Sequence, residues 1–122
     1  MISKESMLLK SCLELLSWKK IFHYRNNSGA FKTDRGGFYR FGESGSPDII
    51  AILRIGGLSA ILGLELKVNK NKATPNQTNW GKRFESEANG FWFIIRNLED
   101  LEKSLKYVHT EAMQIMQKGI LR

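Results

Sequence analysis

The sequence predicts one domain of the α/β class, in which a mixed central sheet is flanked by helices. The chain has 122 residues, a length typical of a single domain, and we expect that domain to span 1–122. Hydrophobic residues make up 42% of the chain, which is enough for a packed core. Stretches with apolar residues at helical spacing alternate with short apolar stretches of strand character, and this alternation indicates the mixed class.

Local signals place the elements along the chain. Ser3 is expected to cap the first helix, and Gly56-Gly57 is a typical hairpin turn between the two longest strands. The segment 26–37 is rich in turn-forming residues, so we expect a mobile loop there. In order, the expected elements are a helix at 3–20, strands at 22–25, 38–41, 48–54 and 58–68, a helix at 74–89, a strand at 91–96 and a helix from 97 onward.

The later elements have the clearest signals. Thr74 to Gln77 offers an N-cap, a proline at the first helical position and a capping-box glutamine, and Asn89-Gly90 is a typical helix end. The strand at 91–96 is apolar throughout, so we expect it to be covered on both faces. Buried stripes are expected on the first helix at Leu8, Leu9, Cys12, Leu15 and Leu16, and on the last at Leu98, Leu101, Leu105, Val108 and Met116.

Composition favours a soluble protein with a polyanionic partner. The formal net charge is +7, which favours nucleic acid as a partner without establishing it. Cys12 is the one cysteine, so the chain cannot form an internal disulfide, and a buried, inert thiol is expected. No stretch approaches the roughly 18 apolar residues of a spanning helix, and no signal-peptide pattern is present. We therefore expect no membrane partner and a cytoplasmic location.

The residues of greatest chemical interest lie at one end of the predicted hairpin. Glu65 and Lys67 are two positions apart on a strand, so their side chains point to the same face. Leu64 and Leu66 point to the opposite face. Asp48 begins the antiparallel neighbouring strand and is expected to lie beside Glu65. Two carboxylates and one ammonium group would then meet at the end of the sheet.

Two adjacent carboxylates repel each other, and one takes up a proton unless a cation lies between them. Oxygen ligands alone favour Mg²⁺ or Mn²⁺ over zinc. Such a metal would activate water against a phosphate, while Lys67 would orient or deprotonate that water or stabilise the transition state. The alternative is a plain surface ion pair between Glu65 and Lys67. The apolar strand around them and Pro47-Asp48 at hairpin distance favour an active site.

These residues resemble the signature of the PD-(D/E)XK nuclease superfamily, in which Pro47-Asp48 is followed by Glu65-x-Lys67. More narrowly, the chain is similar to a stand-alone VRR-NUC domain, a type often encoded by bacteriophages. The resemblance runs from the first helix to the last strand. Its motifs are RNNSGA at 25–30, GSPDII at 45–50, GLELK at 63–67 and TPNQ at 74–77.

The resemblance implies a restriction-endonuclease-like core and a phosphodiesterase that needs Mg²⁺, for which Mn²⁺ would substitute. It implies that Asp48, Glu65 and the carbonyl of Leu66 are metal ligands and that Lys67 is the catalytic lysine. It also implies a bacterial cell or a phage-infected host as the location.

Two further residues match the family by position. Glu5 matches a glutamate of the first helix near the metal, although an acid in a first helical turn is also favoured by the helix dipole. Gln77 matches a catalytic glutamine, although it is also the capping-box partner of Thr74. Gln77 shares a helical face with Trp80 and Phe84, so both of its roles are compatible.

Basic residues after the Glu-x-Lys strand are expected to contact DNA phosphates: Lys70, Lys72, Lys82 and Arg83. The alternative is a solvated helix face next to a charged loop. Weaker candidates are Lys32, Arg35 and Arg40. His23 and His109 lack the spacing of a metal pair, so structural roles are expected for both. The three tryptophans, Trp18, Trp80 and Trp92, are expected in the core.

Together these features predict a Mg²⁺-dependent, structure-selective DNA endonuclease, most specifically a Holliday-junction resolvase. A homodimer is expected, because two active sites would cut opposed strands of a four-way junction. Its interface is expected on the exposed face of the first helix or of the apolar hairpin. Three alternatives stay open: a monomeric nuclease acting on flaps or ends, a non-catalytic domain that binds branched DNA, and a nuclease acting on RNA.

Overall fold

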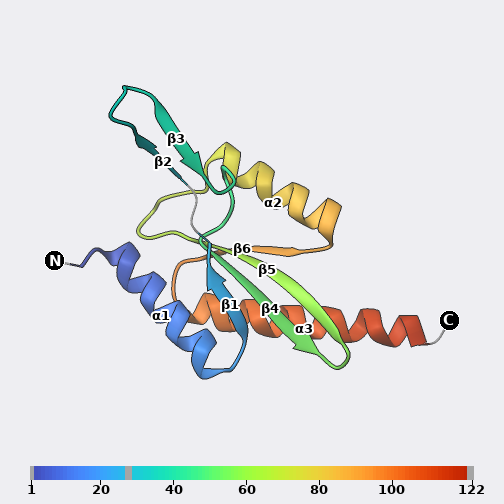
Figure 1. Ribbon diagram of the computed structural model, residues 1–122. Coiled ribbons are helices and arrows are strands. Elements are labelled where there is room, and N and C mark those ends of the chain that lie inside the picture. Colours follow the sequence, from blue (N-terminus) through green and yellow to red (C-terminus); the bar gives the residue numbers. More distant parts are fainter. Residues whose placement is uncertain (1, 27–28, 121–122) are drawn as a thin grey trace.

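The computed structural model describes residues 2–26 and 29–120 (Figure 1). The fold is mixed α/β, as predicted, and its arrangement is consistent with a restriction-endonuclease-like core. The main sheet has the order β1-β4-β5-β6, with β6 parallel to β5 and the other pairs antiparallel. The elements are α1 (Lys4–Trp18), β1 (Phe22–Arg25), β2 (Gly29–Lys32), β3 (Phe38–Phe41), β4 (Ile49–Ile55), β5 (Leu58–Leu66), α2 (Pro75–Ala88), β6 (Phe91–Ile95) and α3 (Leu98–Ile120).

The hydrophobic core lies on one face of the sheet, where α1 and α3 pack. Alternate residues of β5, such as Leu62, Leu64 and Leu66, point into it, as period-two alternation requires. Cys12 is buried there, and burial raises the pKa of its thiol to about 11, so the thiol stays protonated and unreactive. The predicted α1 stripe packs into this core, as do Leu101, Leu105, Val108 and Met116 of α3.

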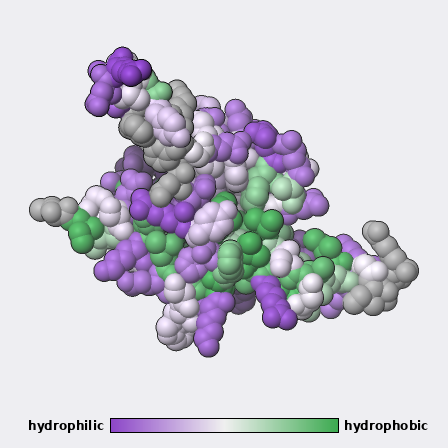
Figure 2. All heavy atoms as spheres, viewed as in Figure 1, coloured by the Kyte–Doolittle hydropathy of each residue, from purple (hydrophilic) through white to green (hydrophobic). Residues whose placement is uncertain are grey.

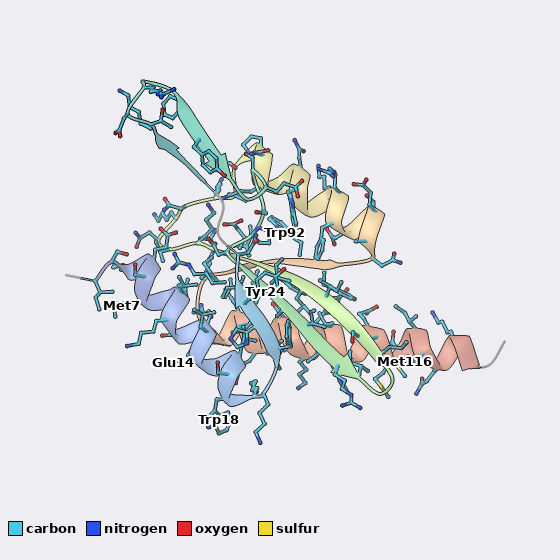
Figure 3. The ribbon with its side chains drawn as sticks, viewed as in Figure 1. Met7, Glu14, Trp18, Tyr24, Trp92 and Met116 are labelled. Carbon is cyan, nitrogen blue, oxygen red and sulfur yellow. The ribbon has the colours of Figure 1, made fainter. Side chains whose placement is uncertain are left out.

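Helix α2 covers part of the opposite face of the sheet. A glycine at position 63 permits its close approach, because a Cβ atom there would lie 3.0 Å from the Pro47 ring and 3.3 Å from Trp80. Trp92 of β6 packs beneath the same helix (Figure 3). Strand β6 is therefore covered on both faces, as predicted, since Phe91 and Phe93 contact Tyr107 of α3.

The segment predicted to be a mobile loop contains a strand. Its described part forms β2, which pairs with β3 in a separate hairpin that projects from the body (Figure 1). The turn is closed by a hydrogen bond from the Thr33 N–H to the Gly37 carbonyl, and Gly36 has a positive φ of 83°. The turn-forming residues therefore belong to the turn of a hairpin. The sequence pattern did not reveal that the residues on either side of this turn pair as strands. Residues 27 and 28 lie outside the described part of the chain.

Three smaller predictions were wrong. Helix α1 ends at Trp18 because Lys20 adopts a left-handed backbone with a φ of 59°. Trp18 is therefore at the helix end, 81% exposed, and not in the core. Leu98 is 41% exposed because α3 packs on the sheet only from Leu101 onward.

Within the described ranges, no helix is long and apolar enough to cross a membrane.

Candidate active site

The end of the β4–β5 hairpin brings Asp48 and Glu65 together, as the sequence predicts. Ile49 pairs with Leu64, so the next step of the antiparallel register places Asp48 opposite Glu65. The backbone N–H of Leu66 donates to Asp48 Oδ2 at 2.8 Å. The Asp48 side chain thereby takes the place of the next ladder hydrogen bond and is fixed at the strand end. In a strand, the N–H and carbonyl of one residue point to the same edge, so the carbonyl of Leu66 belongs to this edge too.

Asn26 holds the loop that carries Asp48, a role that the sequence analysis missed. Its side-chain Nδ2 donates to Ser46 Oγ and to the Pro47 carbonyl, both at 2.9 Å. Its backbone N–H donates to the Asp48 carbonyl at 2.8 Å. The motif at 25–30 had been noted as a family resemblance, but no sequence pattern linked Asn26 to a loop some twenty residues later.

The same loop is pressed against the first turn of α2. Gly45 has a φ of 84°, and a Cβ atom on it would lie 2.7 Å from the backbone oxygen of Asn76. The side chain of Asn76 also donates to Ser44 Oγ at 2.6 Å. Asp48 and α2 are thus placed relative to each other through this loop.

Replacing Gly45 with alanine is expected to destabilise the fold by about 1–3 kcal/mol and to slow any reaction that needs Asp48 in place. The added Cβ would meet backbone, which cannot move aside as a side chain can. Gly57→Ala is the matched control, because nothing lies within 4 Å of its Cβ position at the far end of the hairpin. Urea unfolding of both variants measures the difference. Equal stability of the two would contradict this role of Gly45.

Glu65 is buried, with 3% of its surface exposed, although it is charged in its ordinary state. Gln77 Nε2 donates to Glu65 Oε2 at 3.3 Å. Gln77 Oε1 accepts from the Thr74 N–H at 2.9 Å, and the Gln77 N–H donates back to Thr74 Oγ1. Gln77 therefore closes the capping box of α2, as predicted, and also reaches Glu65. A catalytic role for it stays a prediction.

The surroundings of Glu65 raise the pKa of its carboxyl from 4.5 to about 8. Loss of water around the buried group is the largest cause, followed by a hydrogen bond with Asp48 and the negative charge of Asp48. The positive charge of Lys67 lowers the pKa in part, and the negative charge of Glu5 raises it slightly. Without a cation, the carboxyl of Glu65 therefore keeps its proton near neutral pH.

One atom of this pair has the character of an unused ligand. Glu65 Oε1 is buried, and no N–H or O–H group in the described ranges donates to it. Ionising Glu65 would leave this atom a buried carboxylate oxygen without a donor, which costs free energy, and a divalent cation would remove that cost. The donor set of Asp48, Glu65 and a carbonyl consists of oxygens alone, which fits Mg²⁺ or Mn²⁺.

The acidic side chains near this pair do not form a larger cluster. Across residues 2–26 and 29–120, no three His, Cys, Asp or Glu side chains are grouped closely enough to hold a metal ion. Glu5 is exposed on α1, and its charge acts on Glu65 without joining it in such a group. Its predicted role as a metal ligand has no contact to support it and stays a prediction.

Lys67 follows β5 on the same face as Glu65. Its backbone N–H donates to the Ile95 carbonyl at 3.1 Å, which continues the pairing of β5 with β6 beyond the strand end. Its side chain is half-buried, and no carboxylate of the described residues lies within ion-pair distance of it. The ammonium group is therefore available to a ligand at the site.

Arg96 fixes the loop between Lys67 and α2, a second role that the sequence analysis missed. Its guanidinium donates to the carbonyls of Asn69 at 3.2 Å and Asn71 at 2.8 Å. Lys4 of α1 adds a bond to Asn69 Oδ1 at 3.3 Å. These contacts hold Lys70 and Lys72 as exposed residues on an ordered loop beside the site.

The predicted DNA-contacting residues differ in how free their charges are. Lys70, Lys72 and Lys82 are exposed and form no ion pair with the described residues. Arg83 instead pairs with Glu87 at 2.9 Å and with Glu43 at 3.5 Å. Both pairs are exposed and weak, so they reduce the pull of Arg83 on a phosphate without abolishing it.

The structure also gives the positions of the two histidines and of the weaker candidates for DNA contact. His23 is structural, as predicted: its ring contacts the Ile21 carbonyl at 2.7 Å and Ser17 Oγ at 3.4 Å. His109 is exposed on α3. Lys32 and Arg35 are exposed on the β2–β3 hairpin, and the side chain of Arg40 lies outside what is described.

Comparisons with protein-family models, with curated proteins and with solved structures gave no significant match.

Proposed function

We propose that this chain is a metal-dependent endonuclease that hydrolyses phosphodiester bonds in DNA. The observation that carries the proposal is the pairing of Asp48 with the buried Glu65 at a strand end, with Lys67 on the same face. Such an arrangement costs free energy in the empty protein, and sites of that kind are enriched in function. Two carboxylates and a lysine match what phosphate ester hydrolysis needs.

In the proposed site, Mg²⁺ or Mn²⁺ would be held by Asp48, Glu65 and the carbonyl of Leu66. When bound, the metal supplies positive charge against the phosphate and its transition state. Lys67 adds a second positive charge and orients the attacking water through its Nζ donors. Gln77 fixes the direction of the Glu65 carboxylate. Hydrolysis adds water across one P–O bond and leaves a phosphomonoester on one strand end and a hydroxyl on the other.

Charge supports a nucleic acid as the substrate. The net charge is +7, and three exposed lysines that form no ion pair with the described residues, Lys70, Lys72 and Lys82, follow Lys67 in the chain. Positive groups of this kind bind the phosphate backbone and carry no sequence information. These lysines therefore give no selection by base sequence, and we propose that the chain selects its DNA by branch structure instead.

Resolution of four-way junctions by a homodimer is the most specific form of this proposal. Two related sites would cut opposed strands in pairs. The two faces expected to associate do carry exposed apolar side chains, with Met7 and Trp18 on α1 and Leu58 in the β4–β5 hairpin. Sedimentation of the purified chain measures the association directly.

Cleavage of a labelled four-way DNA junction, beside matched duplex, flap, single strand and an RNA junction, tests the proposed function. Paired symmetric cuts confined to the DNA junction are expected, with Mg²⁺ or Mn²⁺ and not with EDTA. Cuts confined to flaps or ends would replace the resolvase by a monomeric nuclease, and cuts in RNA alone would change the substrate. Binding to branched DNA without cleavage in any metal would contradict the proposed enzyme activity and favour a domain that only binds DNA.

A further inference from the structure

A groove runs along the sheet face that α2 leaves uncovered. Its volume is about 320 Å³, and it lies above β4, between β1 on one side and α2 on the other. Figure 2 shows hydrophobic side chains gathered in the middle of this face, beneath α2. Its apolar and aromatic lining consists of Tyr24, Ile50, Ile52, Ile61, Trp80 and Phe84.

The groove has aromatic walls and an apolar floor. Tyr24, which is 50% exposed, stands on β1 (Figure 3). Trp80 of α2 forms part of the opposite wall and is itself stacked on Phe84, with ring centroids 4.8 Å apart. Isoleucines of β4 and β5 make the floor. A flat, aromatic group of modest size suits such a groove, because it can stack on an aromatic side chain of the lining.

Three polar residues, Asn26, Glu43 and Ser46, also line the groove. The Nδ2 of Asn26 is already used to hold Ser46 and Pro47, which leaves its Oδ1 as the acceptor, and the carboxylate of Glu43 is shared with Arg83 at 3.5 Å. Such acceptors suit the exocyclic amino groups that cytosine, adenine and guanine carry.

The groove and the candidate active site share the residues that hold the loop of Asp48. Asn26 and Ser46 line the groove and, through their hydrogen bonds, also hold that loop. Ile50 on the groove floor is two residues beyond Asp48 on the same strand, roughly 7 Å away. That separation is about the length of one nucleotide unit, so a phosphate at Asp48 would have a neighbouring base within reach of the groove.

We propose that this groove binds one unstacked nucleobase, next to the phosphate that lies at Asp48 and Glu65. The proposal deepens the proposed function and rests on it for the choice of DNA as ligand. A paired and stacked base does not expose its faces, so the slot accepts only nucleotides freed at a branch point, a flap or a single strand. The slot thereby supplies the selectivity for branched DNA that exposed lysines alone do not give.

Binding of DNA in EDTA tests the proposal without any need for cleavage. Tyr24→Ala is expected to weaken binding to a four-way junction by about 5- to 150-fold, the range for loss of one base–aromatic stack. Binding to a matched duplex should change by less than about twofold, since no base leaves the stack. Tyr24→Phe keeps the ring face and should restore junction binding. A 2-aminopurine at the branch point should lose fluorescence with the wild-type chain and not with Tyr24→Ala.

Phe22→Ala is the matched control, because Phe22 is a 66% exposed aromatic on the same strand and face but outside the groove. Equal losses of affinity for the two alanine variants, or equal losses of affinity for junction and duplex, would contradict binding of a base in the groove. The outcome is independent of catalysis. Binding that depends on Tyr24 in a chain that never cuts DNA would support the base-binding groove and contradict the proposed nuclease. Cleavage that Tyr24→Ala leaves unaffected would support the nuclease and contradict the base-binding groove.

Discussion

Replacing Lys67 with alanine is expected to lower DNA cleavage by about 10²- to 10⁴-fold while leaving the affinity for the same DNA nearly unchanged. The reason lies in the position of its ammonium group. Lys67 is half-buried beside Glu65, and its positive charge lowers the pKa of that carboxyl. Its loss therefore removes a positive charge from the place where the reaction develops negative charge. A single lysine among several contributes little to binding of the DNA backbone.

Lys70→Ala is the matched control for this prediction, since Lys70 is exposed on the loop only three residues further on. It should weaken binding slightly, more so at low salt, and leave the single-turnover rate at saturating DNA unchanged. Single-turnover rates with Mg²⁺ and binding isotherms in EDTA separate the two effects. Cleavage at the wild-type rate by Lys67→Ala would remove the lysine from the mechanism.

Substitution of Glu65 by glutamine is expected to abolish metal-dependent cleavage and to change how stability depends on pH. The folded chain holds a proton on Glu65 up to about pH 8, whereas the unfolded chain loses it near 4.5. Between these values the folded state binds more protons, so without metal the wild-type stability falls as pH rises from about 4.5 to about 8. The loss amounts to at most about 5 kcal/mol at about 1.4 kcal/mol per pKa unit. Glu65→Gln has no such proton and should lack this component.

Metal binding should compete with the same proton. At pH 7 the wild-type chain is expected to release close to one proton for each Mg²⁺ bound, and the affinity should fall about tenfold for each pH unit below 8. Calorimetry in two buffers of different ionisation enthalpy counts the protons without reference to cleavage. Affinity that is independent of pH between 6 and 8 would mean that Glu65 is not the residue that exchanges a proton for the metal.

Much of the scaffold was predictable because strong local signals and tertiary packing agree. The capping box at Thr74 and Gln77 and the hairpin turn at Gly56 are fixed by residues a few positions apart, and both are present as expected. Alternation along β5 placed Glu65 opposite to Leu64 and Leu66 correctly. The same alternation, together with the length of the hairpin, sufficed to bring Asp48 beside Glu65.

The parts that escaped prediction depend on contacts between distant segments. Asn26 binds a loop about twenty residues further on, and Arg96 binds carbonyls of Asn69 and Asn71, which precede it by 27 and 25 positions. Neither contact leaves a periodic trace in the sequence. The groove between Tyr24 and Trp80 likewise exists only because α2 covers part of the sheet face and leaves the remainder open.

Cleavage of a labelled four-way DNA junction by the wild-type chain and by Asp48→Asn, each with Mg²⁺ and with EDTA, tests the central claim most directly. Asp48→Asn keeps an acceptor for the Leu66 N–H but lacks the charge needed to hold a metal. Metal-dependent cleavage by the wild-type chain and its loss in the variant are the predicted results. Cleavage that survives in EDTA, or that Asp48→Asn retains at the wild-type rate, would contradict a metal-dependent active site at Asp48 and Glu65.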